Sequence, residues 1–99
     1  MNKLNSDEIF ERTANFLDQL VIDNFKVTDP HEFLVLATYY KNTDFYLENK
    51  EEINLEEYKD IKDVYQDMMF KIKYYPFLAR FTVAGLIPVM YDKYMETTK

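Results

Sequence analysis

The fold is decided by residues 54–75, which read NLEEYKDIKDVYQDMMFKIKYY. Apolar side chains recur there at three- and four-residue intervals, which places them on one face of an α-helix. They are Tyr58, Ile61, Tyr65, Met68, Met69 and Ile72. Asn54 and Glu57 stand three residues apart, in the pattern of a capping box at a helix start. We therefore expect an amphipathic helix over residues 55–74.

Two earlier segments begin with the same kind of helix-start signature. Asn5 precedes Glu8 by three residues, so the two residues can bond reciprocally across a first helical turn. Asp29 stands directly before Pro30, with Glu32 three residues after it, and proline is favoured at the first position of a helix. Helices are therefore expected to begin near residues 6 and 30.

Proline and apolar spacing set the remaining boundaries. Pro76 disfavours helical backbone in the residue before it, so a last helix should begin just after it. The second helix either ends near Lys41 or continues to Leu47, because an apolar residue returns after a polar interruption. The expected helices cover residues 6–24, 30–41, 55–74 and 77–95. They predict one all-α domain over residues 1–99, a small four-helix bundle or an orthogonal four-helix domain.

The residue types that most catalytic and metal sites need are scarce. The chain has one glycine, no cysteine, one histidine (His31) and one serine (Ser6). One glycine cannot form a glycine-rich phosphate loop, and the absence of cysteine removes thiol nucleophiles and zinc–thiolate sites. We expect no catalytic residue, no cofactor and no metal, and hence a protein that is not an enzyme.

Composition also bears on the compartment. The absence of cysteine suits a reducing environment, and the first eight residues lack the apolar core of a secretory signal. The longest apolar stretch, residues 77–91, is too short to span a bilayer and contains Arg80. We expect a cytoplasmic protein without a membrane span.

Charge is unevenly distributed along a chain of net charge −6. Residues 48–67 hold eight acids and three lysines, and four of the acids line up on one side of the expected third helix: Glu56, Asp60, Asp63 and Asp67. This acidic row is either a solvated face or a docking surface for a partner with a basic surface. A third interpretation is imitation of a phosphate backbone. Direct nucleic-acid binding is disfavoured, since phosphate affinity comes from Lys and Arg.

The expected last helix, residues 77–95, is apolar around nearly its whole circumference. Such a helix is normally buried on all sides, and three other helices can hardly surround it in a domain this small. Either it is central in an orthogonal arrangement, or part of it meets another chain, most simply a second copy in a homodimer. The interface residues expected in that case are Val83, Leu86 and Met90.

Together these features predict a non-enzymatic protein–protein interaction module. In size, acidity and helical character the chain is similar to phage-encoded inhibitors and bacteriocin immunity proteins, although no motif matches a family pattern. We expect a small acidic regulator, inhibitor or immunity-type protein of bacterial or phage origin. The alternative is an acidic nucleic-acid mimic that blocks a DNA-binding protein.

Overall fold

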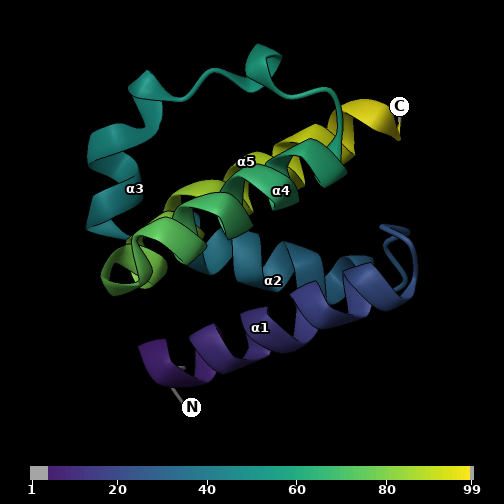
Figure 1. Ribbon diagram of the computed structural model, residues 1–99, viewed down its shortest axis with the longest axis horizontal. Helices are drawn as coiled ribbons and strands as arrows, with labels where there is room; N and C mark the ends of the chain where they lie inside the picture. The colour runs from purple at the N-terminus through teal and green to yellow at the C-terminus, as the bar shows by residue number, and fades with distance from the viewer. Residues whose placement is uncertain (1–4, 99) are drawn as a thin grey trace.

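The computed structural model describes residues 5–98, most of which are helical (Figure 1). Within them the α-helices are α1 (Ser6–Ile22), α2 (Pro30–Lys41), α3 (Asp44–Asn49), α4 (Ile61–Tyr74) and α5 (Ala79–Thr97). Three short 3-10 turns are η1 (Lys50–Glu52), η2 (Leu55–Glu57) and η3 (Pro76–Leu78). No strand occurs in residues 5–98. The predicted all-α fold is confirmed, with α3 as a short additional helix.

The helices are arranged as two pairs with a cover on one side. α1 and α2 lie together in the lower half of Figure 1, and α4 and α5 form a hairpin that η3 closes. α3 leads into residues 50–58, which cross above the hairpin to the start of α4. We call residues 50–58 the arch, because they bridge α3 and α4 with only 3-10 turns.

The first two predicted helix starts are confirmed, and each is capped as expected. Asn5 Oδ1 accepts a hydrogen bond from the Glu8 backbone N–H at 2.8 Å, and its Nδ2 donates to Glu8 Oε1 at 3.1 Å. Asp29 Oδ1 accepts from the Glu32 backbone N–H at 3.0 Å, with Pro30 at the first helical position. A side-chain cap satisfies one of the backbone donors that a helix start leaves free.

The third predicted start, at Asn54, is wrong by about two turns. Asn54 caps only η2, accepting from the Glu56 backbone N–H at 3.0 Å. Tyr58 then has extended backbone, and α4 begins at Ile61 with Asp60 as its cap. Two capping sequences compete within seven residues, and the later one begins the helix that buries Ile61, Val64 and Met68.

The second helix ends at Lys41, so the shorter of its two predicted forms is the right one. Thr43 then caps a new helix, α3, by accepting from the Tyr46 backbone N–H at 3.3 Å. No residue of α3 is fully buried, although Phe45 packs its ring 5.1 Å from the ring of Phe81 on α5. The polar interruption is therefore a true break, followed by a helix that rests on α5.

α5 is the central element of the core. It packs between α2 and α4, and seven of its residues from Val83 to Met90 are buried. Phe33 of α2 lies fully buried beside it, with ring centroids 5.1 Å from Tyr91 and 4.7 Å from Phe16 of α1. A helix that is apolar on most sides is thus covered on most sides, as its composition requires.

The expectation that Val83, Leu86 and Met90 form an exposed interface is wrong. They are 3%, 8% and 0% exposed, respectively. For Leu86 one reason is cover from outside α5, because Phe45 of α3 and Ile53 of the arch line the same hollow. These three residues therefore belong to the core and do not form an exposed interface.

Gly85 offers a direct test of packing along α5. Its φ is not positive, and an added Cβ would meet only Phe45 Cε2, at 3.6 Å, an ordinary contact. Glycine inside a helix loses more chain entropy on folding than alanine does, so Gly85→Ala should raise the free energy of unfolding by about 0.5–1 kcal/mol. Urea denaturation followed by circular dichroism measures this, with Ala14→Gly as a control that should lose a similar amount. A destabilised Gly85→Ala would mean that Phe45 needs the space.

Candidate protein-binding surface

The predicted acidic row is not a single free face. Glu56 lies on η2, while Asp60 caps α4 by accepting from the Asp63 backbone N–H at 3.1 Å. Asp63 in turn accepts from the Lys59 backbone N–H at 2.9 Å. Three of the four carboxylates in the row, those of Asp60, Asp63 and Asp67, are thus hydrogen-bonded to neighbouring groups where the arch meets α4.

Asp67 ties the arch to α4 most directly. It accepts a hydrogen bond from the Tyr58 hydroxyl at 2.7 Å and pairs with Lys71 at 3.0 Å. Burial, together with the hydrogen bond and charge of Asp67, raises the pKa of Tyr58 well above its ordinary value. A tyrosine hydroxyl is protonated at neutral pH in any case, and the raised pKa extends its hydrogen bond to Asp67 further into the alkaline range.

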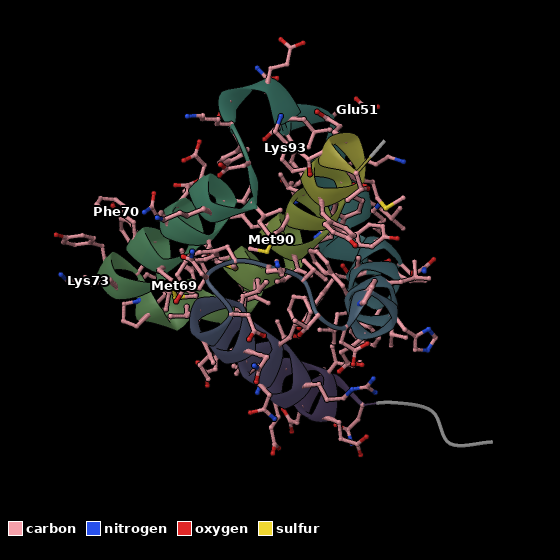
Figure 2. The ribbon with its side chains drawn as sticks, turned by 90° about the vertical axis from the view of Figure 1, so that its right-hand side faces the viewer. Glu51, Met69, Phe70, Lys73, Met90 and Lys93 are labelled. Atoms are coloured by element: carbon pink, nitrogen blue, oxygen red, sulfur yellow. The ribbon has the colours of Figure 1, made fainter. Side chains whose placement is uncertain are left out.

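A cluster of exposed carboxylates lies instead on α3 and the arch. Six acids there are exposed and flank Lys50: Asp44, Glu48, Glu51, Glu52, Glu56 and Glu57. In Figure 2, Glu51 marks this edge of the molecule, well away from Phe70 and Lys73 of α4. α3 and the arch therefore form a strongly acidic surface.

A second exposed surface is aromatic and surrounds the turn between α4 and α5. Its residues, which we call the aromatic corner, are Phe70, Tyr74, Tyr75, Phe77, Leu78 and Phe81. All six are exposed, and Phe77 is 80% exposed. The rings of Phe70 and Tyr74 pair at 4.7 Å on the outer side of α4. Six large apolar side chains exposed within twelve residues are more than the scattered ones that most surfaces carry.

The charges at the aromatic corner are all basic in sequence but largely balanced in space. Residues 68–91 contain Lys71, Lys73 and Arg80 and no acid. Lys71 pairs with Asp67, and Arg80 pairs with Asp7 at 2.8 Å. Among residues 5–98, no carboxylate lies within ion-pair distance of Lys73, whose Nζ is 5.7 Å from the Tyr74 ring centre. A nearly neutral apolar surface loses its water at a low cost in free energy, because few charges must be desolvated.

Three apolar hollows surround the first half of α5 beside this corner. One of about 240 Å³ lies between α1 and α4, and another of about 240 Å³ is lined by α1, α2, α3 and α5. A third, of about 200 Å³, lies between α3, the arch and α5. Phe10 lines the first two, and Phe45 and Phe81 line the second and third. Apolar side chains of a partner could enter such hollows next to the exposed aromatic rings.

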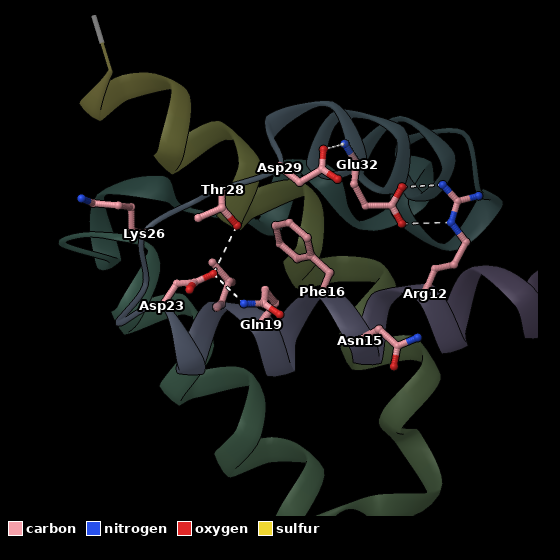
Figure 3. Close-up of a pocket in the computed structure, with 10 residues that line it drawn as sticks. Arg12, Asn15, Phe16, Gln19, Asp23, Lys26, Thr28, Asp29 and Glu32 are labelled. Carbon is pink, nitrogen blue, oxygen red and sulfur yellow. Dashed lines mark hydrogen bonds and ion pairs between the residues drawn. The ribbon is translucent and has the colours of Figure 1, made fainter.

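A fourth cleft, of about 230 Å³, lies between α1, α2 and their connection, and most of the residues that line it have polar side chains (Figure 3). Arg12 donates two hydrogen bonds to Glu32 across it, and this contact raises the pKa of Arg12. Asp23 accepts from Gln19 at 2.8 Å and from Thr28 at 3.2 Å. These hydrogen bonds hold α1 to α2 and to the connection between them.

Within residues 5–98, no group of three or more His, Cys, Asp or Glu side chains is placed to hold a metal ion. His31 is exposed near the start of α2. No helix in this part of the chain is long and apolar enough to cross a membrane. Comparisons with known protein families, characterised proteins and solved structures give no match to this chain.

Sequence reasoning missed the aromatic corner, although a signal for it exists. The segment from Phe70 to Phe81 combines five aromatic residues with three bases and no acid, in a chain of net charge −6. Apolar periodicity does not tell which side of a helix faces the core near its end. The exposure arises because α4 ends at Tyr74, and η3 turns Phe77 outward.

Reversing the three aspartates of the acidic row should now destabilise the fold. The variant with Asp60→Lys, Asp63→Lys and Asp67→Lys loses a helix cap and the hydrogen bonds of Tyr58 and Lys59, at a cost of about 2–4 kcal/mol. The matched control reverses three exposed acids of the arch, Glu51, Glu52 and Glu56, and should change stability by no more than about 0.5 kcal/mol. Urea denaturation of both variants checks this. If the two variants were equally stable, the three aspartates would be an ordinary solvated row.

Proposed function

We propose that this protein is a non-enzymatic protein–protein interaction module that binds its partner through the aromatic corner. The observation that carries the proposal is the exposure of the corner's six large apolar side chains around η3. Aromatic residues and arginine are enriched where proteins bind one another, and they supply most of the binding energy. The neighbouring hollows and balanced charges suit a surface that loses its water on binding.

The size of the corner fits a standard interface. At roughly 200 Å² of accessible surface for a whole aromatic side chain, the exposed parts of its six residues amount to roughly 600–700 Å². Each partner in a standard protein–protein complex contributes about 800 Å². The corner with its rim is therefore large enough for one specific contact.

A small module of this kind acts by occupying a surface of its partner, as a regulator, an inhibitor or an immunity-type protein does. Its acidity serves solubility and steering, because a net charge away from zero keeps an apolar surface from aggregating. Self-association is one form of the same contact. A two-fold dimer would place the same corner of both copies face to face, with only the two Lys73 charges left to repel.

Removing two rings of the corner should abolish binding without unfolding the protein. Phe70 and Phe77 are exposed side chains, so Phe70→Asp with Phe77→Asp should leave helical content unchanged while losing affinity capture and any dimer. The matched control is Ile22→Asp with Leu34→Asp, two exposed apolar residues outside the corner. Capture from an extract of the source organism, and mass by light scattering over a concentration series, provide the measurements. The proposal fails if the corner variant retains the partner that wild type captures.

A second candidate function, imitation of nucleic acid, is favoured by the six exposed carboxylates of α3 and the arch. A mimic would bind a basic DNA-binding protein, and its affinity would fall steeply as salt rises. Glu51→Lys with Glu52→Lys and Glu56→Lys should then abolish capture, while the corner variant should still bind. Loss in the corner variant with capture retained by the arch variant would exclude the mimic.

A further inference from the structure

A fifth cleft, of about 550 Å³, lies where the connection between α1 and α2 meets the start of α4 and the end of α5. It is more than twice as large as each of the four described above. Clefts that bind small molecules usually have volumes of about 300–1,000 Å³, so this cleft is large enough for one and the others are not. It lies at the opposite end of the α4–α5 hairpin from the aromatic corner (Figure 1).

Two lysines line the fifth cleft. Lys26 follows the turn after α1, and Lys62 is the second residue of α4. Both are exposed, and within residues 5–98 no carboxylate lies within ion-pair distance of either amine. Figure 3 shows the Lys26 side chain pointing away from Phe16, out of the cleft between α1 and α2 that it also lines. Within the described part of the chain, both amines are therefore available to a ligand.

The charge of the fifth cleft is opposite to that of the whole protein. Asp60 is the one acidic side chain among the described residues that line it, and its Oδ1 already accepts the Asp63 backbone N–H at 3.1 Å. Two lysines and one aspartate give the lining a net charge of +1, whereas the chain carries −6. An anion is therefore attracted to this cleft in a way that the acidic surface of α3 and the arch does not offer.

Apolar side chains lie beside the lysines in the same cleft. Phe25, Val27 and Tyr94 are half-buried, and Ile61 is 9% exposed. Lys62 Nζ lies 5.7 Å from the centre of the Phe25 ring, so positive charge and aromatic surface are adjacent. A ligand that combines an acidic group with an apolar body would contact both kinds of side chain at once.

The wall that carries Phe25 is held in place by the protein itself. Asn24 and Phe25 both have left-handed backbone, with φ of 53° and 64°, which is rare for a side chain as large as phenylalanine. Phe25 N–H donates to Leu20 O at 2.6 Å, and Asn24 N–H donates to Val21 O at 3.1 Å. The Phe25 ring packs edge-on against Tyr65 of α4, with ring centres 5.2 Å apart. The aromatic wall is therefore positioned without a ligand, which lowers the cost of binding one.

We propose that the fifth cleft binds a small organic anion with an aromatic or apolar body, of the class of aryl carboxylates and aryl phosphates. The acidic group pairs with Lys62, the lysine beside the Phe25 ring, and Lys26 adds a second attraction. The body of the ligand lies on Phe25 and Ile61. This site is separate from the aromatic corner, so the inference goes beyond the proposed function.

The probes are benzoate and phenyl phosphate, with benzamide as the neutral counterpart and inorganic phosphate as the anion without a ring. Amide chemical shifts of the whole ¹⁵N-labelled protein measure binding and locate it. We expect an aryl anion to shift residues 24–27, 60–62 and 94–98, with a Kd of about 1 mM for a ligand this small. Benzamide and inorganic phosphate should bind at least about tenfold more weakly. Equal binding of benzoate and benzamide, or shifts confined to other residues, overturns the proposal.

Charge reversal tests the role of the two lysines. Lys26→Glu with Lys62→Glu should weaken the aryl anion about tenfold or more, since two exposed attractions become repulsions. The matched control, Lys50→Glu with Lys59→Glu, changes the net charge by the same amount at exposed positions outside the cleft. It should alter the Kd by no more than about twofold, because charges at a distance are screened by salt. Circular dichroism checks that both variants keep their helical content. Equal weakening in the two variants would mean that only overall charge matters, and the site would be rejected.

The fifth cleft and the aromatic corner can be tested separately. The variant with Phe70→Asp and Phe77→Asp should bind the aryl anion like wild type, because both residues lie at the other end of the hairpin. Loss of anion binding in that variant, with helical content intact, would place the anion at the corner and overturn this inference. The proposed function is judged instead by capture of the partner, which the Lys26→Glu and Lys62→Glu variant should retain.

Discussion

The burial of α5 is the constraint on which the rest of the structure depends. Its apolar residues point in nearly every direction, so each side of the helix must be covered by another element. α2 and α4 cover two sides, and α3 with the arch covers a third through Phe45 and Ile53. Within residues 5–98 no further long helix covers that side, so a short helix and two 3-10 turns complete the core.

Completing the core around α5 determines which apolar residues remain outside. α1 is held to α2 and does not close on α4, so Met69 and Ile72 keep partly exposed side chains along a groove. At the other boundary the chain must reverse between α4 and α5, and η3 leaves Phe77 in solvent. The candidate binding surfaces thus occur where the helix pairs end or fail to meet. Apolar surface left in water does not contribute to the free energy of unfolding, and binding of a partner would bury it.

The sequence predicted local features better than tertiary ones. The starts at Asn5 and Asp29 are correct because a cap needs only the residues of its own first turn. The start at Asn54 is wrong because Asp60 offers a second cap, and burial of Ile61 decides between them. The exposed surfaces could not be predicted in the same way, since apolar periodicity gives the direction of a stripe but not the neighbour that covers it. Composition indicated an interaction module, and only the tertiary arrangement located its surfaces.

The arch is attached to the rest of the fold more weakly than the helix pairs are. It lacks an α-helix, carries four exposed glutamates and is held to the hairpin by a few side chains, chiefly Ile53, Leu55 and Tyr58. Segments with few apolar anchors separate from the rest at a lower free energy than the whole domain unfolds. We therefore expect the arch to separate from the fold before any other element. Its detachment uncovers Leu86 while the two helix pairs stay packed. Mutual repulsion among the glutamates favours that opening, so added salt, which screens like charges, should keep the arch closed.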